Sequence, residues 1–151
     1  MGPTKNVGYL LQHLSFVLQR HSDQVLQEQL GIGFSQFKIL MVLQWNPSVK
    51  QRKIAERLGQ TEASISRQIS LLKKEGLLTR VASPENRRQH LTRPTPKGEK
   101  LTDKALEILN NYHAPMFAQL SDKQQQQLQE ILSTMHAFVC NAQEHGEIHK
   151  H

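Results

Sequence analysis

A single glycine between two short helical segments constrains the fold of this chain more than any other feature. Gly59 follows one short run of helical apolar spacing and precedes another. A helix-turn-helix requires a small residue where its helices cross, a turn residue that tolerates positive φ, and an aliphatic residue that holds the second helix. Ala55, Gly59 and Ile65 meet these requirements. A helical hairpin that only contributes to a core could carry the same triplet.

Signals that begin and end helices divide the rest of the chain. Apolar residues recur at helical spacing in segments that end at Gly31, Pro47, Gly59 and Gly76. The second, third and fourth helices are expected to be capped by Ser35, by a capping box at Ser48 to Gln51, and by Thr61. The first half of the chain is therefore predicted to hold four helices.

A hairpin and two more helices are predicted after Gly76. Residues 77–82 and 89–93 are β-prone runs on either side of the turn sequence 83–86. Thr95 and Pro96 are suited to begin a fifth helix, which Pro115 is expected to break or kink. A second capping box, Ser121 to Gln124, precedes an apolar stripe from Leu128 to Val139. The predicted fold is mainly α with a small β-hairpin, in one domain of 151 residues.

The positive charge is concentrated in the middle third of the chain. Between Lys50 and Lys100 there are 13 Lys and Arg against 5 Glu, a net of +8, whereas the formal charge of the whole chain is +6. The same segment has no Phe, Trp or Tyr, on which the bases of single-stranded nucleic acid usually stack. These features favour double-stranded DNA as the partner.

The helix after Gly59 is predicted to read DNA. With its aliphatic residues inward, the opposite face is small and polar, and it can enter a major groove. The residues expected at this DNA interface are Thr61, Ala63, Ser64, Ser66, Arg67 and Ser70. Arg67 is the expected base reader, because a guanidinium can donate two parallel hydrogen bonds to guanine.

The chain resembles the MarR family of winged helix-turn-helix transcriptional regulators from about Val7 to about Ala142. Residues 54–59 and 61–72 are similar to the family's helix-turn-helix, residues 74–78 to the exit from its recognition helix, and residues 83–98 to its wing. Asn86 stands where the family normally has Asp, and Pro94 where it has Leu. The resemblance implies that Arg88 enters the minor groove, while Arg87, on the opposite face of an extended strand, meets phosphate or water.

The resemblance also implies an intertwined homodimer that binds an inverted repeat. The expected DNA-binding lobe is 35–94, and the expected dimerisation helices lie in 4–31 and 96–143. Members often act as repressors released by a small aromatic or phenolic effector. His13, Phe16, Trp45 and Tyr112 could border such a ligand, although residues of this kind are more often core or interface.

Other classes of protein are disfavoured. No phosphate-binding loop, nucleophile elbow or metal-protease motif occurs, so no enzyme activity and no cofactor are expected. Cys140 is expected to be buried and inert, and the histidines of residues 145–151 to be incidental rather than a metal site. Without a long apolar N-terminal stretch, the expected compartment is the cytoplasm. A small basic dimer could also be a non-sequence-specific architectural DNA-binding protein.

Overall fold

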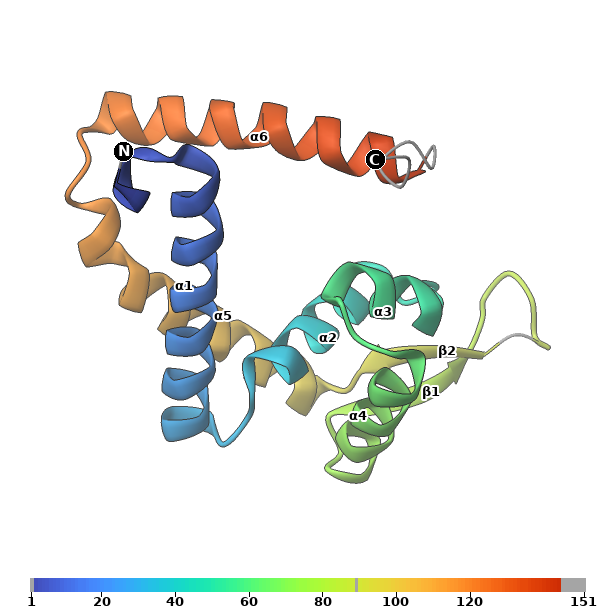
Figure 1. The fold of residues 1–151 in the computed structure, drawn as a ribbon. Coiled ribbons are helices and arrows are strands. Elements are labelled where there is room, and N and C mark those ends of the chain that lie inside the picture. The colour runs from blue at the N-terminus through green and yellow to red at the C-terminus, as the bar shows by residue number, and fades with distance from the viewer. Residues whose placement is uncertain (1, 89, 145–151) are drawn as a thin grey trace. The chain divides into compact units, whose positions relative to one another are not determined.

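The computed structural model describes residues 2–88 and 90–144 and confirms the mainly helical fold with a β-hairpin (Figure 1). The elements are η1 (Pro3–Lys5), α1 (Val7–Leu30), α2 (Phe34–Trp45), α3 (Gln51–Leu58), α4 (Glu62–Lys74), β1 (Leu78–Ala82), β2 (His90–Pro94), α5 (Pro96–Phe117) and α6 (Asp122–Glu144). They form two compact units, Met1–Asn110 and Asn111–His151.

Two of the three predicted caps in the first half were wrong. Thr61 does cap α4, since its Oγ1 accepts the backbone N–H of Ser64. The N-cap of α2 is Gly33 rather than Ser35, because Gln36 accepts the N–H of Gly33 and Asp23 accepts that of Phe34. The helix therefore begins one residue before Ser35.

The capping box predicted before α3 is also absent. Lys50 is the N-cap of α3 and makes no side-chain capping bond. The Ser48 hydroxyl instead donates to Oδ1 of Asn46, 3.0 Å away, so it is not available to the first turn. The matching box before α6 is confirmed, because Ser121 and Gln124 each accept the other's backbone N–H.

The first unit is held together by two clusters of buried side chains. One joins α2, α3, α4 and β1, and its fully buried members include Ile39, Leu40, Ile54, Ile65 and Leu72. The other joins α1, α2 and α5 through Leu26, Ile32, Phe37, Ala105 and Leu109. Because α2 contributes to both clusters, it connects α1 and α5 with the helix-turn-helix.

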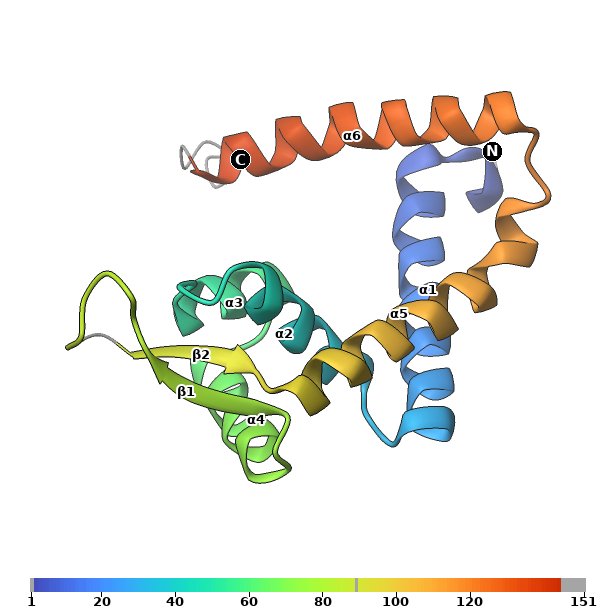
Figure 2. The ribbon, with the colours of Figure 1, turned by 180° about the vertical axis from the view of Figure 1, so that it is seen from behind.

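The hairpin extends from the helices of the first unit in both views (Figures 1 and 2). β1 and β2 are antiparallel, with Leu78 opposite Pro94 and Ala82 opposite His90. Arg87 and Arg88 lie in the connecting turn and not on the return strand, so the predicted alternation of their faces does not apply. The directions of these two side chains depend instead on the conformation of the turn.

The start of α5 is joined directly to the exit from α4. The Thr95 hydroxyl donates to the carbonyl of Gly76 and accepts the N–H of Gly98, as expected for a cap. The N–H of Thr95 donates to the carbonyl of Leu77. In the second unit, α5 includes Pro115 and continues to Phe117, so the helix ends two residues later than predicted.

Replacing Gly98 by alanine is expected to destabilise the first unit by about 2 to 3 kcal/mol. A Cβ at this position would overlap with the Leu77 carbonyl oxygen, so the backbone of the α4–β1 junction would have to move. Urea unfolding should show this loss, whereas the exposed substitution Asp103→Ala on the same helix should change the free energy of unfolding by less than about 0.5 kcal/mol. Equal stabilities of the two variants would contradict the close approach.

None of the helices within residues 2–88 and 90–144 combines the length and apolar character needed to cross a bilayer.

Candidate nucleic-acid interface

The helix-turn-helix forms around the three residues that the sequence singles out. Ala55 is buried where α3 meets α4, Gly59 ends α3 with φ of 63°, and Ile65 is fully buried on α4. Ile69 and Leu72 continue the buried face of α4. The predicted inward face of this helix is therefore confirmed.

The opposite face of α4 is open to solvent. Ala63, Ser66, Arg67 and Ser70 are exposed, and Thr61 is exposed at the cap, whereas Ser64 is half-buried. Small side chains around one long arginine allow close approach to a groove, with Arg67 reaching furthest. The sequence predicted this arrangement except for Ser64.

Ser64 belongs to a network of polar side chains that the sequence analysis missed. Its hydroxyl donates to Gln60 Oε1, and Gln68 Nε2 lies 3.1 Å from Ser64 Oγ and 2.6 Å from Gln60 Oε1. Ser35, on the first turn of α2, donates to Gln68 Oε1 and accepts from Gln60 Nε2. The four side chains connect α2, the turn before α4, and α4 itself.

This network holds α4 against α2 by hydrogen bonds with specific geometry. Apolar packing alone leaves a helix some freedom to slide or rotate, whereas a connected polar network favours one arrangement. The spacing of Gln60, Ser64 and Gln68, four residues apart, was visible in the sequence, but their connection to Ser35 was not. We infer that Ser64 orients the helix rather than contacting bases.

Gln68→Met is expected to lower the affinity for a preferred DNA site by about tenfold, because methionine keeps the side-chain length but removes the hydrogen bonds. The exposed substitution Gln29→Met on α1 serves as the matched control. Binding titrations on specific and random DNA should show the loss mainly on specific DNA. Reduced thermal stability with an unchanged ratio of the two affinities would assign Gln68 a structural role only.

Within the described residues, no carboxylate neutralises the arginines expected at the interface. Across residues 2–88 and 90–144, no carboxylate forms an ion pair with Arg67, Arg87 or Arg88. Arg52 and Lys53, in contrast, both pair with Glu56, at 3.3 and 3.8 Å. The three unpaired guanidinium groups are therefore available to phosphates or base edges.

Asn86 organises the wing turn through the backbone. Its Oδ1 accepts the backbone N–H of Arg88 at 3.1 Å, and the Ser83 hydroxyl accepts that of Glu85. An asparagine at this position therefore orders the main chain that carries Arg88, without the salt bridge that an aspartate could form.

The four residues expected near an effector lie on three helices. His13 stacks on Tyr9 with ring centroids 5.6 Å apart, and Phe16, on the same helix, lies below the guanidinium of Arg20. Trp45 is 78% exposed at the end of α2, and Tyr112, in the second unit, contacts His113 edge-on. Of these, only His13 and Phe16 share an element.

Three further titratable features are Cys140, the C-terminal histidines and Lys38, of which only the first two were subjects of a sequence expectation. Cys140 is half-buried rather than buried, and its Sγ lies 3.3 Å from Nε2 of His136, one helical turn away. His145, Glu147, His149 and His151 lie outside the described residues. Burial lowers the pKa of Lys38, whose ammonium lies 4.8 Å from the centre of the Phe34 ring.

The part of the chain that carries this site is similar to known proteins. A model of the MarR family matches residues 30–89, which span α2 to the wing. A curated relative, the uncharacterised helix-turn-helix regulator YhbI of Bacillus subtilis, is 26% identical over 117 residues, which cover 78% of this chain and 76% of YhbI. The repressor Rv2887 of Mycobacterium tuberculosis is 24% identical over 129 residues, 85% of this chain and 92% of Rv2887.

Solved structures share the fold over most of the chain. The structure of Rv2887 with salicylic acid has a TM-score of 0.74 at 24% identity and covers 86% of this chain and 96% of that one. The MepR–DNA complex of S. aureus has a TM-score of 0.68 at 25% identity, and the match covers 87% of this chain and 97% of the MepR chain. The chain therefore shares the fold of these proteins.

Proposed function

Because the chain belongs to the MarR family of winged helix-turn-helix transcriptional regulators, we propose that it binds an inverted-repeat operator as a homodimer and represses transcription. It is a DNA-binding regulator and not an enzyme. The observation that carries the proposal is the open face of α4, where small side chains surround Arg67, which pairs with none of the described carboxylates. The S. aureus relative MepR supports it, since that protein was solved with DNA.

Within this proposal each exposed interface residue has a role. Thr61, Ala63, Ser66, Arg67 and Ser70 face the major groove, with Arg67 on a guanine. By resemblance to the family's wing, and with its backbone N–H held by Asn86, Arg88 is assigned to the minor groove, and Arg87 to a phosphate. Residues 35–94 form the DNA-binding lobe, while 4–31 and 96–143 supply the dimer interface.

The dimer is supported by apolar side chains that one chain leaves in solvent. On α6, Ile131, Leu132, Met135, Phe138 and Val139 are between 41% and 75% exposed. Val7, Leu10 and Leu14 on α1 are exposed as well. Exposed apolar side chains in this number are costly in water, and a second copy of the chain would cover them.

The effector in this proposal is a small aromatic or phenolic molecule that releases the protein from DNA. The support is the relative Rv2887, which was solved with salicylic acid. His13, Phe16, Trp45 and Tyr112 carry rings that could stack on such a ligand. Substituting Trp45 or Phe16 by leucine should weaken salicylate binding without changing DNA affinity in its absence.

The ratio of specific to non-specific affinity tests the proposal against an architectural role. DNA fragments selected from a random pool should contain an inverted repeat with half-sites about one helical turn apart. At one fixed salt concentration, affinity for that repeat should exceed affinity for scrambled DNA by about 1,000-fold or more. A ratio near one would indicate an architectural DNA-binding protein.

A further inference from the structure

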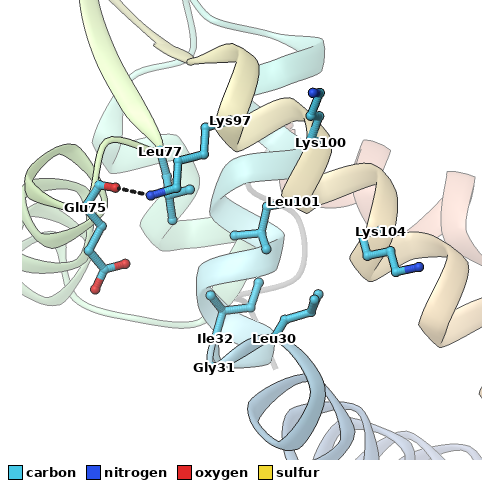
Figure 3. A pocket seen from close by; sticks show the side chains of 9 residues that line it. All are labelled: Leu30, Gly31, Ile32, Glu75, Leu77, Lys97, Lys100, Leu101 and Lys104. Atoms are coloured by element: carbon cyan, nitrogen blue, oxygen red, sulfur yellow. Dashed lines mark hydrogen bonds between the residues drawn. The ribbon is translucent and has the colours of Figure 1, made fainter.

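A groove of about 830 Å³ lies beside the C-terminal end of α4, at the opposite end of that helix from Thr61 (Figure 3). Residues of the α1–α2 junction, the α4–β1 junction and the first half of α5 line it. All of them belong to the first unit. The groove includes none of the four residues proposed for the effector, so it is a separate feature of the first unit.

The floor of the groove is aliphatic. Leu101 extends from α5 and lies between Leu77 and the pair Leu30 and Ile32 (Figure 3). Ile32 and Leu77 are nearly fully buried, and Leu30 and Leu101 are half-buried. This surface can take up a hydrocarbon chain, because each methylene removed from water contributes about 0.8 kcal/mol.

The rim of the groove is basic along α5. Lys97, Lys100 and Lys104 follow each other at helical spacing, so Lys100 and Lys104 lie one turn apart on the same face. In the described ranges no carboxylate pairs with Lys100, and Lys104 makes only an exposed contact with Glu107 at 3.8 Å. Exposed pairs of this kind are weak, so an incoming anion can replace the contact.

The two ends of the rim differ in charge. Lys97 donates to the backbone carbonyl of Glu75 at 3.1 Å, and the Glu75 carboxylate lines the groove on that side. Figure 3 shows Glu75 and Lys104 at opposite sides of Leu101. A negative group is therefore favoured at Lys100 and Lys104 and disfavoured beside Glu75, so a ligand with one anionic end fits better than a polyanion.

We infer that this groove binds an amphipathic carboxylate, whose carboxylate lies between Lys100 and Lys104 and whose hydrocarbon chain covers Leu101 and the neighbouring aliphatic side chains. An inorganic anion would leave the floor uncovered, and a neutral lipid-like molecule would gain nothing from the two ammonium groups. The volume lies within the range of small-molecule sites. This site is additional to the effector site and does not depend on DNA binding.

Octanoate is the probe that tests the site, with 1-octanol as a neutral control and acetate as an anion without a chain. In titrations of the full-length protein, octanoate should shift the methyl resonances of Ile32, Leu77 and Leu101 and bind at least about tenfold more tightly than either control. The double variant Lys100→Gln and Lys104→Gln should lower the affinity for octanoate by about tenfold and leave the affinity for 1-octanol unchanged. Lys123→Gln on α6 should alter neither affinity.

Three results would overturn the site. They are octanoate binding unaffected by the double variant, 1-octanol binding as tightly as octanoate, and shifts confined to methyl groups outside the groove. Both lysines are exposed, so the variant is expected to fold, which its unfolding temperature will show. Because no DNA is present in these titrations, failure here leaves the proposed operator binding untouched.

Discussion

Replacing Leu132 by aspartate is expected to convert the proposed dimer into monomers and to lower operator affinity by at least about 100-fold. Leu132 lies within the exposed apolar stripe of α6, between Ile131 and Met135. A carboxylate placed there would lose its hydration when the interface formed, and this cost opposes association. Two tethered lobes bind an inverted repeat far more tightly than one, because the second contact is intramolecular.

Sedimentation and DNA titration of the same samples would check this result. Ala137→Asp is the matched control, because helical geometry puts Ala137 on the opposite face of α6, where it is also exposed. The control should remain a dimer with unchanged operator affinity. A wild-type protein that sediments as a monomer at micromolar concentration would rule out the dimer, and unchanged affinity of Leu132→Asp would rule out its role in binding.

Arg67→Ala is expected to lower affinity for the preferred site by about 1 to 3 kcal/mol per half-site, and thus by roughly 30-fold to 10⁴-fold for a dimer. Arg67 is exposed on α4 and no described carboxylate pairs with it. If it donates two parallel hydrogen bonds to a guanine, its loss removes sequence discrimination. Affinity for random DNA should change little, because that affinity comes mainly from phosphate contacts.

Two further variants separate base reading from simple charge. Arg67→Lys keeps the charge but not the planar pair of donors, so it should lose most of the preference for the selected site. Arg87→Ala, in the wing turn, should lower affinity equally on specific and random DNA and reduce the salt slope by about one per subunit. Equal losses on both DNAs for Arg67→Ala would instead make Arg67 a phosphate contact.

The sequence was sufficient to predict the structural features that depend on neighbouring residues. Helical spacing, glycine stops and the Thr61 cap predicted α3, the turn and α4, because such signals act within one or two turns of the chain. The outward face of α4 followed from the same periodicity. The error at Ser48 was local, since its hydroxyl donates to nearby Asn46. The error at Ser35 was not, since Asp23 accepts the N–H of Phe34 from eleven residues away and the Ser35 hydroxyl bonds to Gln68.

The wing is a part of the structure that local sequence signals did not fully predict. The turn and both strands were predicted, yet Arg87 and Arg88 proved to lie in the turn. Strand pairing is set by the register between Leu78 and Pro94, which brings together residues from opposite ends of the hairpin. A count of β-prone residues cannot determine that register, because several pairings satisfy the same composition.

The tertiary structure alone decided the contacts between residues far apart in the sequence. Ser35 meets Gln68 across 33 positions, Lys97 meets the Glu75 carbonyl across 22, and Gly98 lies against the Leu77 backbone. These contacts exist because α2, α4 and α5 pack around shared aliphatic side chains, which have no directional preference of their own. The sequence by itself determined which helices form and which faces are apolar. Packing decided which polar and charged groups those faces bring together.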